Sequence, residues 1–340
     1  MNTPKDLARR VLPEAVWKRL RQMWQRLVAF EQRRLTAACR KFGARNPVEF
    51  QRALEDAGYQ VARSADYYSP LLSVSQLKAN SQRWNRPSSL LGVQYDLNEM
   101  KALLGQLLTQ YLDEFMTLPS YLEITNKGFG PGYTAVDALT LYAMIRHLKP
   151  RRYIEVGSGI STYYCSLAAQ RNEAEGTPLQ ITCIEPYPYE KLSTIPGVHV
   201  LAKKVEDVDR SEFQQLDAND VLFVDSSHIL RIDGDVAFLF LEVIPSLNAG
   251  VITHVHDIPF PYNFPYPPDL WIFGRHWPMF WNEAMVLQAF LAFNRNFDII
   301  LSTPLIRYFD EPFLQQRIPI YETIEQNPNT FSSIWLKRVS

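Results

Sequence analysis

The sequence predicts an α/β fold in which a doubly wound, mostly parallel sheet of seven strands follows a helical N-terminal extension. Two observations carry this prediction. Short apolar segments alternate with helix-like segments from residue 121 to residue 340, as they do in β-α-β units. The first apolar segment runs straight into Gly157-Ser158-Gly159, a tight turn that opens a helix, and open α/β sheets bind ligands at such turns.

Each expected helix and strand is identified by the spacing of its apolar residues and by the Pro and Gly residues that end it. The helix expected over residues 136–148 ends before Pro150, because proline cannot continue it. Residues 303–331 are rich in Pro and Gln and poorly periodic, so we expect no regular element before a last strand that returns antiparallel. The expected strands are residues 152–156, 181–184, 198–201, 221–224, 251–254, 297–301 and 332–336, and the other expected helices of this domain are 161–169, 235–247 and 282–293.

Residues 1–120 are expected to form a helical region, and residues 121–340 the α/β domain. Residues 13–42 read as one long amphipathic helix with an apolar stripe opposite Arg and Lys, followed by helices at 48–57 and 98–115. The stripe predicts packing on the chain's own domain or on a second subunit, as in a homo-oligomer. The helix also combines a basic face with Trp24, which favours binding to anionic lipid, so peripheral contact with an anionic membrane is the alternative.

Composition excludes several classes of protein. The 35 Lys and Arg nearly balance the 36 Asp and Glu, so no overall field favours nucleic acid as a partner. No apolar run is long enough to span a bilayer, and charges interrupt every apolar stretch near the N-terminus, which argues against a signal peptide. The three cysteines fall in expected helices and strands, so we expect a cytoplasmic protein without disulfides.

Acidic residues end the first two strands of the predicted sheet. Glu155 stands just before the glycine turn, where it would repel a phosphate and attract a cationic group. Glu185 ends the next strand, at the position where such folds bind ribose hydroxyls. Nicotinamide-dependent enzymes share that second feature, so Glu185 alone does not tell them apart from other α/β proteins that bind a ribose. A solvated charge at the strand end is the alternative for Glu185.

Histidines and aspartates gather at the ends of two later strands. One buried strand delivers Asp225 and His228 to the carboxyl edge, and the next delivers His256 and Asp257 to the same edge. A polar loop pair without a role is the alternative for His256 and Asp257. His254, two residues before His256, is expected to pack under the sheet.

On these residues, the stretch 126–257 resembles the class I S-adenosylmethionine-dependent methyltransferases, most of all the small-molecule O-methyltransferases. The shared features are the acidic-Val-Gly-Ser-Gly turn, the Asp-x-x-His strand end and the later His-Asp. The resemblance implies that the turn holds the methionine part of S-adenosylmethionine, that Glu185 holds its ribose, and that Glu206 with Asp207 lies near its adenine. Asp225 would lie close to the methyl group. The residues it assigns to cofactor binding are Glu155, Gly157, Ser158, Gly159, Ser161, Thr162, Glu185, Glu206 and Asp225.

Two departures from the family pattern bear on chemistry. Ser161 stands where many members have a third glycine, so the helix must tolerate a hydroxyl there. His256-Asp257 stands where catechol-type members place an Asp-Asn pair of metal ligands. Asp225, His256 and Asp257 suit Mg²⁺, Mn²⁺ or Fe²⁺, and the histidine favours the latter two ions over Mg²⁺.

A segment rich in aromatic and Pro residues lies between His256 and Asn296, with its aromatic residues running from Phe260 to Trp281. It is a candidate lid or platform for the acceptor, with an ordinary packed cover as the alternative. Glu283 opens the next helix, where a capping role is expected first and acceptor binding second.

Together these residues predict transfer of a methyl group to a hydroxyl of a small-molecule acceptor, such as a sugar or a natural product. The acceptor must lose a proton, and His228 or His256 beside Asp225 is the expected base. Two other functions stay open. One is a non-catalytic binding or scaffold protein with this fold. The other is an NAD-dependent oxidoreductase, which would want no acid at Glu155 and a glycine at Thr162.

Overall fold

The computed structural model describes residues 14–61, 67–129, 132–327 and 331–340. The chain divides into two compact units, residues 1–73 and residues 74–340, and each is described by itself. The second unit contains the sheet. It begins before the boundary that we expected near residue 120, because the helix over Leu97–Met116 packs on a helix and a strand of the α/β domain.

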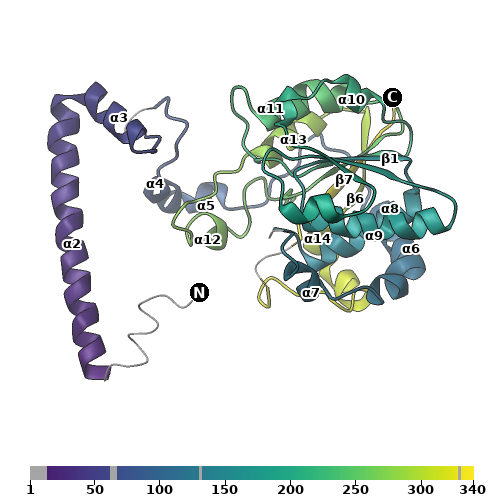
Figure 1. Ribbon diagram of the computed structural model, residues 1–340, viewed down its shortest axis with the longest axis horizontal. Coiled ribbons are helices and arrows are strands. Elements are labelled where there is room, and N and C mark those ends of the chain that lie inside the picture. The colour runs from purple at the N-terminus through teal and green to yellow at the C-terminus, as the bar shows by residue number, and fades with distance from the viewer. Residues whose placement is uncertain (1–13, 62–66, 130–131, 328–330) are drawn as a thin grey trace. The chain divides into compact units, whose positions relative to one another are not determined.

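In the described residues, seven strands form one sheet in the order β3-β2-β1-β4-β5-β7-β6 (Figure 1). The first five strands pair in parallel, and β7 lies antiparallel between β5 and β6. This is the doubly wound α/β fold with an antiparallel last strand that the sequence predicts. The strands are β1 Arg152–Val156, β2 Gln180–Ile184, β3 Val198–Leu201, β4 Val221–Val224, β5 Ile252–Val255, β6 Phe297–Ser302 and β7 Ile334–Arg338.

Helices cover both faces of the sheet, which explains why its central strands are apolar throughout. All four residues of β4 and of β5 are buried. Helices α10, α11 and α13 lie on one face, and α6, α8, α9 and α14 lie on the other (Figure 1). The α-helices of this unit are α4 Val74–Ala79, α5 Ser81–Trp84, α6 Leu97–Met116, α7 Tyr121–Thr125, α8 Ala135–Leu148, α9 Ile160–Ala174, α10 Ser211–Gln214, α11 Asp235–Phe238, α12 Pro268–Trp271, α13 Glu283–Leu291 and α14 Thr303–Arg317.

The register of the strands determines which residues lie next to one another at the carboxyl edge of the sheet. Val156 at the end of β1 is level with Ile184 of β2 and with Val224 of β4. Val224 in turn is level with Val255 of β5. The residues that follow these four strand ends, among them Glu185, Gly157 and Asp225, therefore stand side by side at one edge.

Two segments differ from the expected elements. Residues 303–317 form helix α14, where we expected no regular structure; Ser302 caps its start and Pro304 stands in its first turn. The helix is kinked at Asp310 and contains Pro312, which interrupts the apolar periodicity that would have revealed it. Residues 235–247, expected as one helix, are instead α11, a π-turn over Leu239–Val243 and a 3-10 turn over Ile244–Ser246.

In the first unit, α2 runs over Glu14–Arg45 and α3 over Pro47–Asp56, as the apolar spacing predicts. The apolar stripe of α2 is exposed: Met23, Leu27, Phe30 and Leu35 each have more than half of their surface open to solvent. None of the described helices combines the length and the apolar content needed to cross a bilayer.

Candidate active site

The glycine turn after β1 is built so that only glycine fits at two of its positions. Gly157 has a φ of +77°, and a Cβ there would lie 2.1 Å from the carbonyl oxygen of Asp225. A Cβ on Gly159 would lie 2.6 Å from the carbonyl oxygen of Phe129. The turn is thus in direct contact with the end of β4. Between the two glycines, the Ser158 hydroxyl is buried and has no hydrogen-bond partner in the described part of the chain.

Glu155 lies beneath this turn and is fully buried. Its carboxylate accepts hydrogen bonds of 2.5 Å from the hydroxyls of Ser161 and Thr162. Burial raises the pKa of Glu155 to about 7, although these hydroxyls work in the opposite direction. The hydroxyl of Ser161, at the place of the family's third glycine, is therefore tolerated because Glu155 accepts a hydrogen bond from it. In this arrangement the three side chains are bonded to one another and brace the turn from within.

Glu185 and Glu206 stand where the resemblance implies contacts to ribose and adenine. Glu185 follows β2 directly, is half-buried, and accepts a hydrogen bond of 2.9 Å from the backbone N–H of Tyr187. Glu206 lies in a 3-10 turn, Val205–Asp207, after β3 and is also half-buried. Both carboxylates keep part of their surface open to solvent, which leaves them able to accept hydrogen bonds from a ligand.

The ends of β4 and β5 bring four predicted residues together in what we call the polar cluster: Asp225, His228, His256 and Asp257. Asp225 Oδ1 lies 3.3 Å from His228 Nε2 and 3.4 Å from His256 Nδ1. Asp257 Oδ2 lies 3.4 Å from His228 Nε2 and 3.7 Å from His256 Nδ1. Both aspartates are half-buried and both histidines are buried, so the carboxylates form the solvent side of the cluster.

Glu283 orients His228, a role that the sequence did not indicate. Its carboxylate lies 2.7 Å from His228 Nδ1 and also accepts a hydrogen bond from the Ser226 hydroxyl. We expected Glu283 to cap α13, but its carboxylate turns inward to His228 and Ser226 instead. The His228 ring lies against Trp281, with the ring centroids 4.4 Å apart. Nδ1 is thereby held by a carboxylate while Nε2 faces the two aspartates.

His256 is held in a similar way by Asp137 of α8, a second residue that we did not predict. Asp137 is fully buried, and its Oδ2 lies 3.3 Å from His256 Nε2. The same carboxylate accepts hydrogen bonds from the backbone N–H of Ser332 and the hydroxyl of Ser333, just before β7. In the sequence Asp137 stands three residues after Thr134, a spacing typical of helix capping, and this conceals its contact with His256.

Charges within the polar cluster oppose one another. Burial alone would raise the pKa of Asp225, but the charge of His256 and the hydrogen bonds from both histidines outweigh it, so this pKa lies well below its ordinary value. Burial would lower the pKa of His228, yet the hydrogen bonds to Asp225 and Glu283 and the charges of Glu283 and Asp257 raise it well above its ordinary value. The carboxylates of Asp257 and Asp225 do the same for His256. The cluster thus favours a positive charge among its carboxylates.

The donor set suits a divalent cation. Single ligand atoms of Asp225, His228 and Asp257 lie within 4.8 Å of one another, and two carboxylates with one imidazole are chemically suited to Mn²⁺ or Fe²⁺. We expected His256 as the third ligand. The structure instead groups His228 with the two aspartates and holds His256 against Asp137. His254 packs as expected: it is buried and stacks on Trp335 at 3.8 Å.

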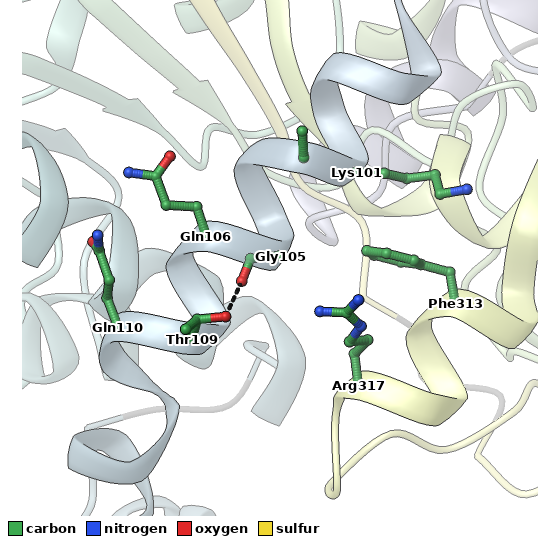
Figure 2. A pocket seen from close by; sticks show the side chains of 8 residues that line it. Lys101, Gly105, Gln106, Thr109, Gln110, Phe313 and Arg317 are labelled. Atoms are coloured by element: carbon green, nitrogen blue, oxygen red, sulfur yellow. Dashed lines mark hydrogen bonds between the residues drawn. The ribbon is translucent and has the colours of Figure 1, made fainter.

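A groove of 450 Å³ is lined by residues of α6 and α14 and shares no residue with the polar cluster. In Figure 2, Phe313 and Arg317 of α14 lie on the side of α6 toward which Lys101 points, whereas Gln106 and Gln110 point the other way. Arg317 stacks on Phe313, and Lys101 at the rim is paired with Asp310. No carboxylate or histidine lines this groove, so it lacks the acid–base groups that the edge of the sheet provides.

Comparison with known proteins agrees with the resemblance found in the sequence. A family model described as a methyltransferase domain matches residues 154–258, which include the glycine turn and the polar cluster. An uncharacterized protein of Archaeoglobus fulgidus is 27% identical over 168 residues, which cover 45% of this chain and 72% of the relative.

Two solved structures are similar at low scores. The SAH-bound methyltransferase of Podospora anserina is 13% identical, covers 81% of this chain and 100% of its own, and has a TM-score of 0.36. The O-methyltransferase TomG of Streptomyces achromogenes, involved in tomaymycin synthesis, is 14% identical, covers 79% of this chain and 100% of its own, and has a TM-score of 0.36. The fold assignment therefore rests on the order and direction of the strands.

Proposed function

Residues 154–258 carry a methyltransferase domain, and from this premise we propose that the chain transfers a methyl group from S-adenosylmethionine to a hydroxyl of a small molecule. The observation that carries the proposal is the direct contact between the glycine turn and the end of β4. That contact supports the proposal because a cofactor bound at the turn would lie next to the polar cluster, as an in-line transfer requires.

The residues present fit the cofactor. The buried Ser158 hydroxyl lacks a partner, and glycines flank it where side chains would fill the space, so a ligand group can approach the backbone closely. Glu185 and Glu206 would accept hydrogen bonds from the ribose and adenine ends. When bound, S-adenosylmethionine supplies an electrophilic methyl group on a sulfonium. Glu155 supports this site from below by fixing the start of α9 through Ser161 and Thr162.

The acceptor hydroxyl must lose its proton, and the two histidines of the polar cluster are the candidates to take it; because the pKa of each is raised, that histidine must first give up its own proton. With Nδ1–H donating to Glu283, His228 presents Nε2 to Asp225 and Asp257, which form the solvent side of the cluster. His256, held by Asp137 through Nε2, presents Nδ1 to the same aspartates. His228 is the more direct candidate, because its carboxylate partner lies at 2.7 Å and fixes the orientation of the ring.

A divalent cation would be held by Asp225, His228 and Asp257, and it would acidify a bound hydroxyl. Asp225 and Asp257, two of the carboxylates that raise the pKa of His228, would then hold the cation in place of the proton of the imidazole. In that form of the site His256, which stays on Asp137, is the remaining base.

Calorimetry with S-adenosylhomocysteine tests the cofactor site. The Glu185→Ala variant should bind roughly tenfold to a hundredfold more weakly, because a charge-assisted hydrogen bond is lost. Glu190→Ala, an exposed carboxylate in the 3-10 turn after β2, is the matched control and should bind as the parent does. If neither the parent nor the control protein binds S-adenosylhomocysteine, the proposed function is wrong.

A further inference from the structure

A second, smaller cavity lies close to the polar cluster. Its volume is 140 Å³, and it is lined by the segment that follows β5 and by the first turns of α14. Three tyrosines form much of its wall: Tyr262 and Tyr266, which stack at 3.7 Å, and Tyr308. We call it the tyrosine pocket.

Arg307 of α14 lines the tyrosine pocket and is the one cation among its lining residues. Only 9% of this residue is exposed, and its Nη1 is buried without a hydrogen-bond partner in the described part of the chain. Its guanidinium lies 4.6 Å over the ring of Phe331. Burial lowers the pKa of Arg307, although the charges of Glu311 and Asp137 work in the opposite direction. Among the described residues no carboxylate lies within ion-pair distance of the guanidinium, so a buried N–H donor is left for a ligand to pair.

The pocket is connected to the polar cluster through neighbouring residues. Phe331, beneath the Arg307 guanidinium, directly precedes Ser332, whose hydroxyl donates to Asp257 over 2.9 Å. The wall residues Phe260 and Pro261 follow Asp257 after two intervening residues. Residues that line the pocket and residues that contact the polar cluster are therefore adjacent along the chain.

The other charges of the pocket restrict what Arg307 can bind. Glu311 already accepts a hydrogen bond of 2.5 Å from the Tyr321 hydroxyl, and Glu325 is exposed at the rim. Both carboxylates would repel a doubly charged phosphate more strongly than a singly charged carboxylate. The planar fork of a guanidinium also matches the two oxygens of a carboxylate.

We propose that Arg307 is the anion-binding residue of an acceptor subsite, and that the acceptor carries a carboxylate which Arg307 pairs while the acceptor's hydroxyl lies at the polar cluster. The inference rests on the proposed function, but the pocket can be tested without any transfer reaction.

Calorimetric titration with benzoate tests the subsite, since the tyrosine walls suit an aromatic ring and the charge suits Arg307. Benzamide, of equal shape but neutral, is the paired probe. The parent chain should bind benzoate with a dissociation constant of about 1 mM or lower. Its affinity for benzamide should be lower by a factor of about ten or more. Arg307→Met should remove this preference. Arg317→Met, on the same helix but in the groove of Figure 2, should retain it.

Thermal unfolding in the same solutions separates loss of binding from loss of the fold. Arg307→Met should be at least as stable as the parent without ligand, because it removes an unpaired buried charge. Benzoate should raise the melting temperature of the parent and of Arg317→Met only. Equal binding of benzoate and benzamide by the parent, unchanged benzoate affinity in Arg307→Met, or no benzoate binding by the parent would each overturn the proposal. Titrating S-adenosylhomocysteine separately shows whether the proposed function fails on its own.

Discussion

The neighbouring strands β1 and β4 each have a carboxylate at their carboxyl end, Glu155 and Asp225. The surroundings of these two carboxylates shift their pKa values in opposite directions. Glu155 in β1 is sealed among hydroxyls, and burial raises its pKa to about 7. Asp225 after β4 is half-buried beside two histidines, which hold its pKa well below the ordinary value despite burial. The strand end alone therefore does not decide the role of an acidic residue. Its partners do: hydroxyl donors make Glu155 a brace, and histidines make Asp225 part of a reactive group.

The largest effect should come from the point where the two strand ends touch. Gly157→Ala places a Cβ 2.1 Å from the Asp225 carbonyl oxygen at a φ of +77°. We expect a loss of about 3 kcal/mol or more in the free energy of unfolding, from backbone strain plus overpacking. Denaturant titration measures it. Gly176→Ala is the control: it has a similar φ of +83° but open space around it, so it should lose only about 1 kcal/mol. Similar losses in both would show that the contact does not matter.

The second effect concerns chemistry at the β4 end alone. His228→Ala should lower the rate of methyl transfer by about 10²-fold or more, and Glu283→Gln by a smaller factor, because the imidazole loses its orienting charge. Both variants should bind S-adenosylhomocysteine like the parent, since neither touches the glycine turn. If His228→Ala and His256→Ala both keep the parent rate, neither histidine is the base and the proposed mechanism fails.

Removal of divalent cations sharpens the same comparison. Treatment with EDTA should lower the transfer rate, and Mn²⁺ or Fe²⁺ should restore it, if Asp225, His228 and Asp257 hold a cation. Calorimetric titration with Mn²⁺ should also show a site that disappears in Asp257→Asn. Full activity in EDTA together with no Mn²⁺ binding would refute the cation and leave the histidines to act alone.

At the β1 end the expected effect is on stability and its pH dependence. Because the pKa of Glu155 is raised in the folded chain, the folded state binds more protons than the unfolded state between about pH 4.5 and pH 7. Stability from this group is therefore lost as the pH rises through that range, by up to roughly 3 kcal/mol. Glu155→Gln should flatten the dependence, measured by denaturant titration at several pH values. Equal slopes in parent and variant would contradict this account of Glu155.

The smallest effect on either strand end should follow deletion of residues 1–73. Both ends belong to the unit of residues 74–340, so affinity for S-adenosylhomocysteine should stay the same. We propose that α2, with its exposed apolar stripe, serves assembly or docking at an anionic membrane. Light scattering or sedimentation with anionic liposomes should therefore change on deletion. If both are unaltered, this role for α2 is wrong.

The strands of the sheet could be predicted from the sequence, because strands buried on both faces are apolar throughout. The glycine turn also indicated which edge of the sheet would bind a ligand. The sequence was also sufficient to bring Asp225, His228, His256 and Asp257 to one edge. It could not reveal Asp137 or Glu283, since both stand at helix starts where an acid is ordinarily explained by capping. Only the packing of α8 and α13 against the edge shows that each carboxylate holds a histidine instead. Helix α14 was missed because Pro312 masks its periodicity, and Arg307 was missed with it.

The position of β7 has a consequence for how the chain is made. This strand is the last of the seven to leave the ribosome, yet it lies between β5 and β6 and forms every bond that joins them within the sheet. Until Ile334–Arg338 has emerged, the inner edges of β5 and β6 present unpaired N–H and C=O groups, which other chains can pair with. Nascent chains stalled before this segment should therefore be especially prone to aggregate, and release of the last strand should be the event that completes the sheet.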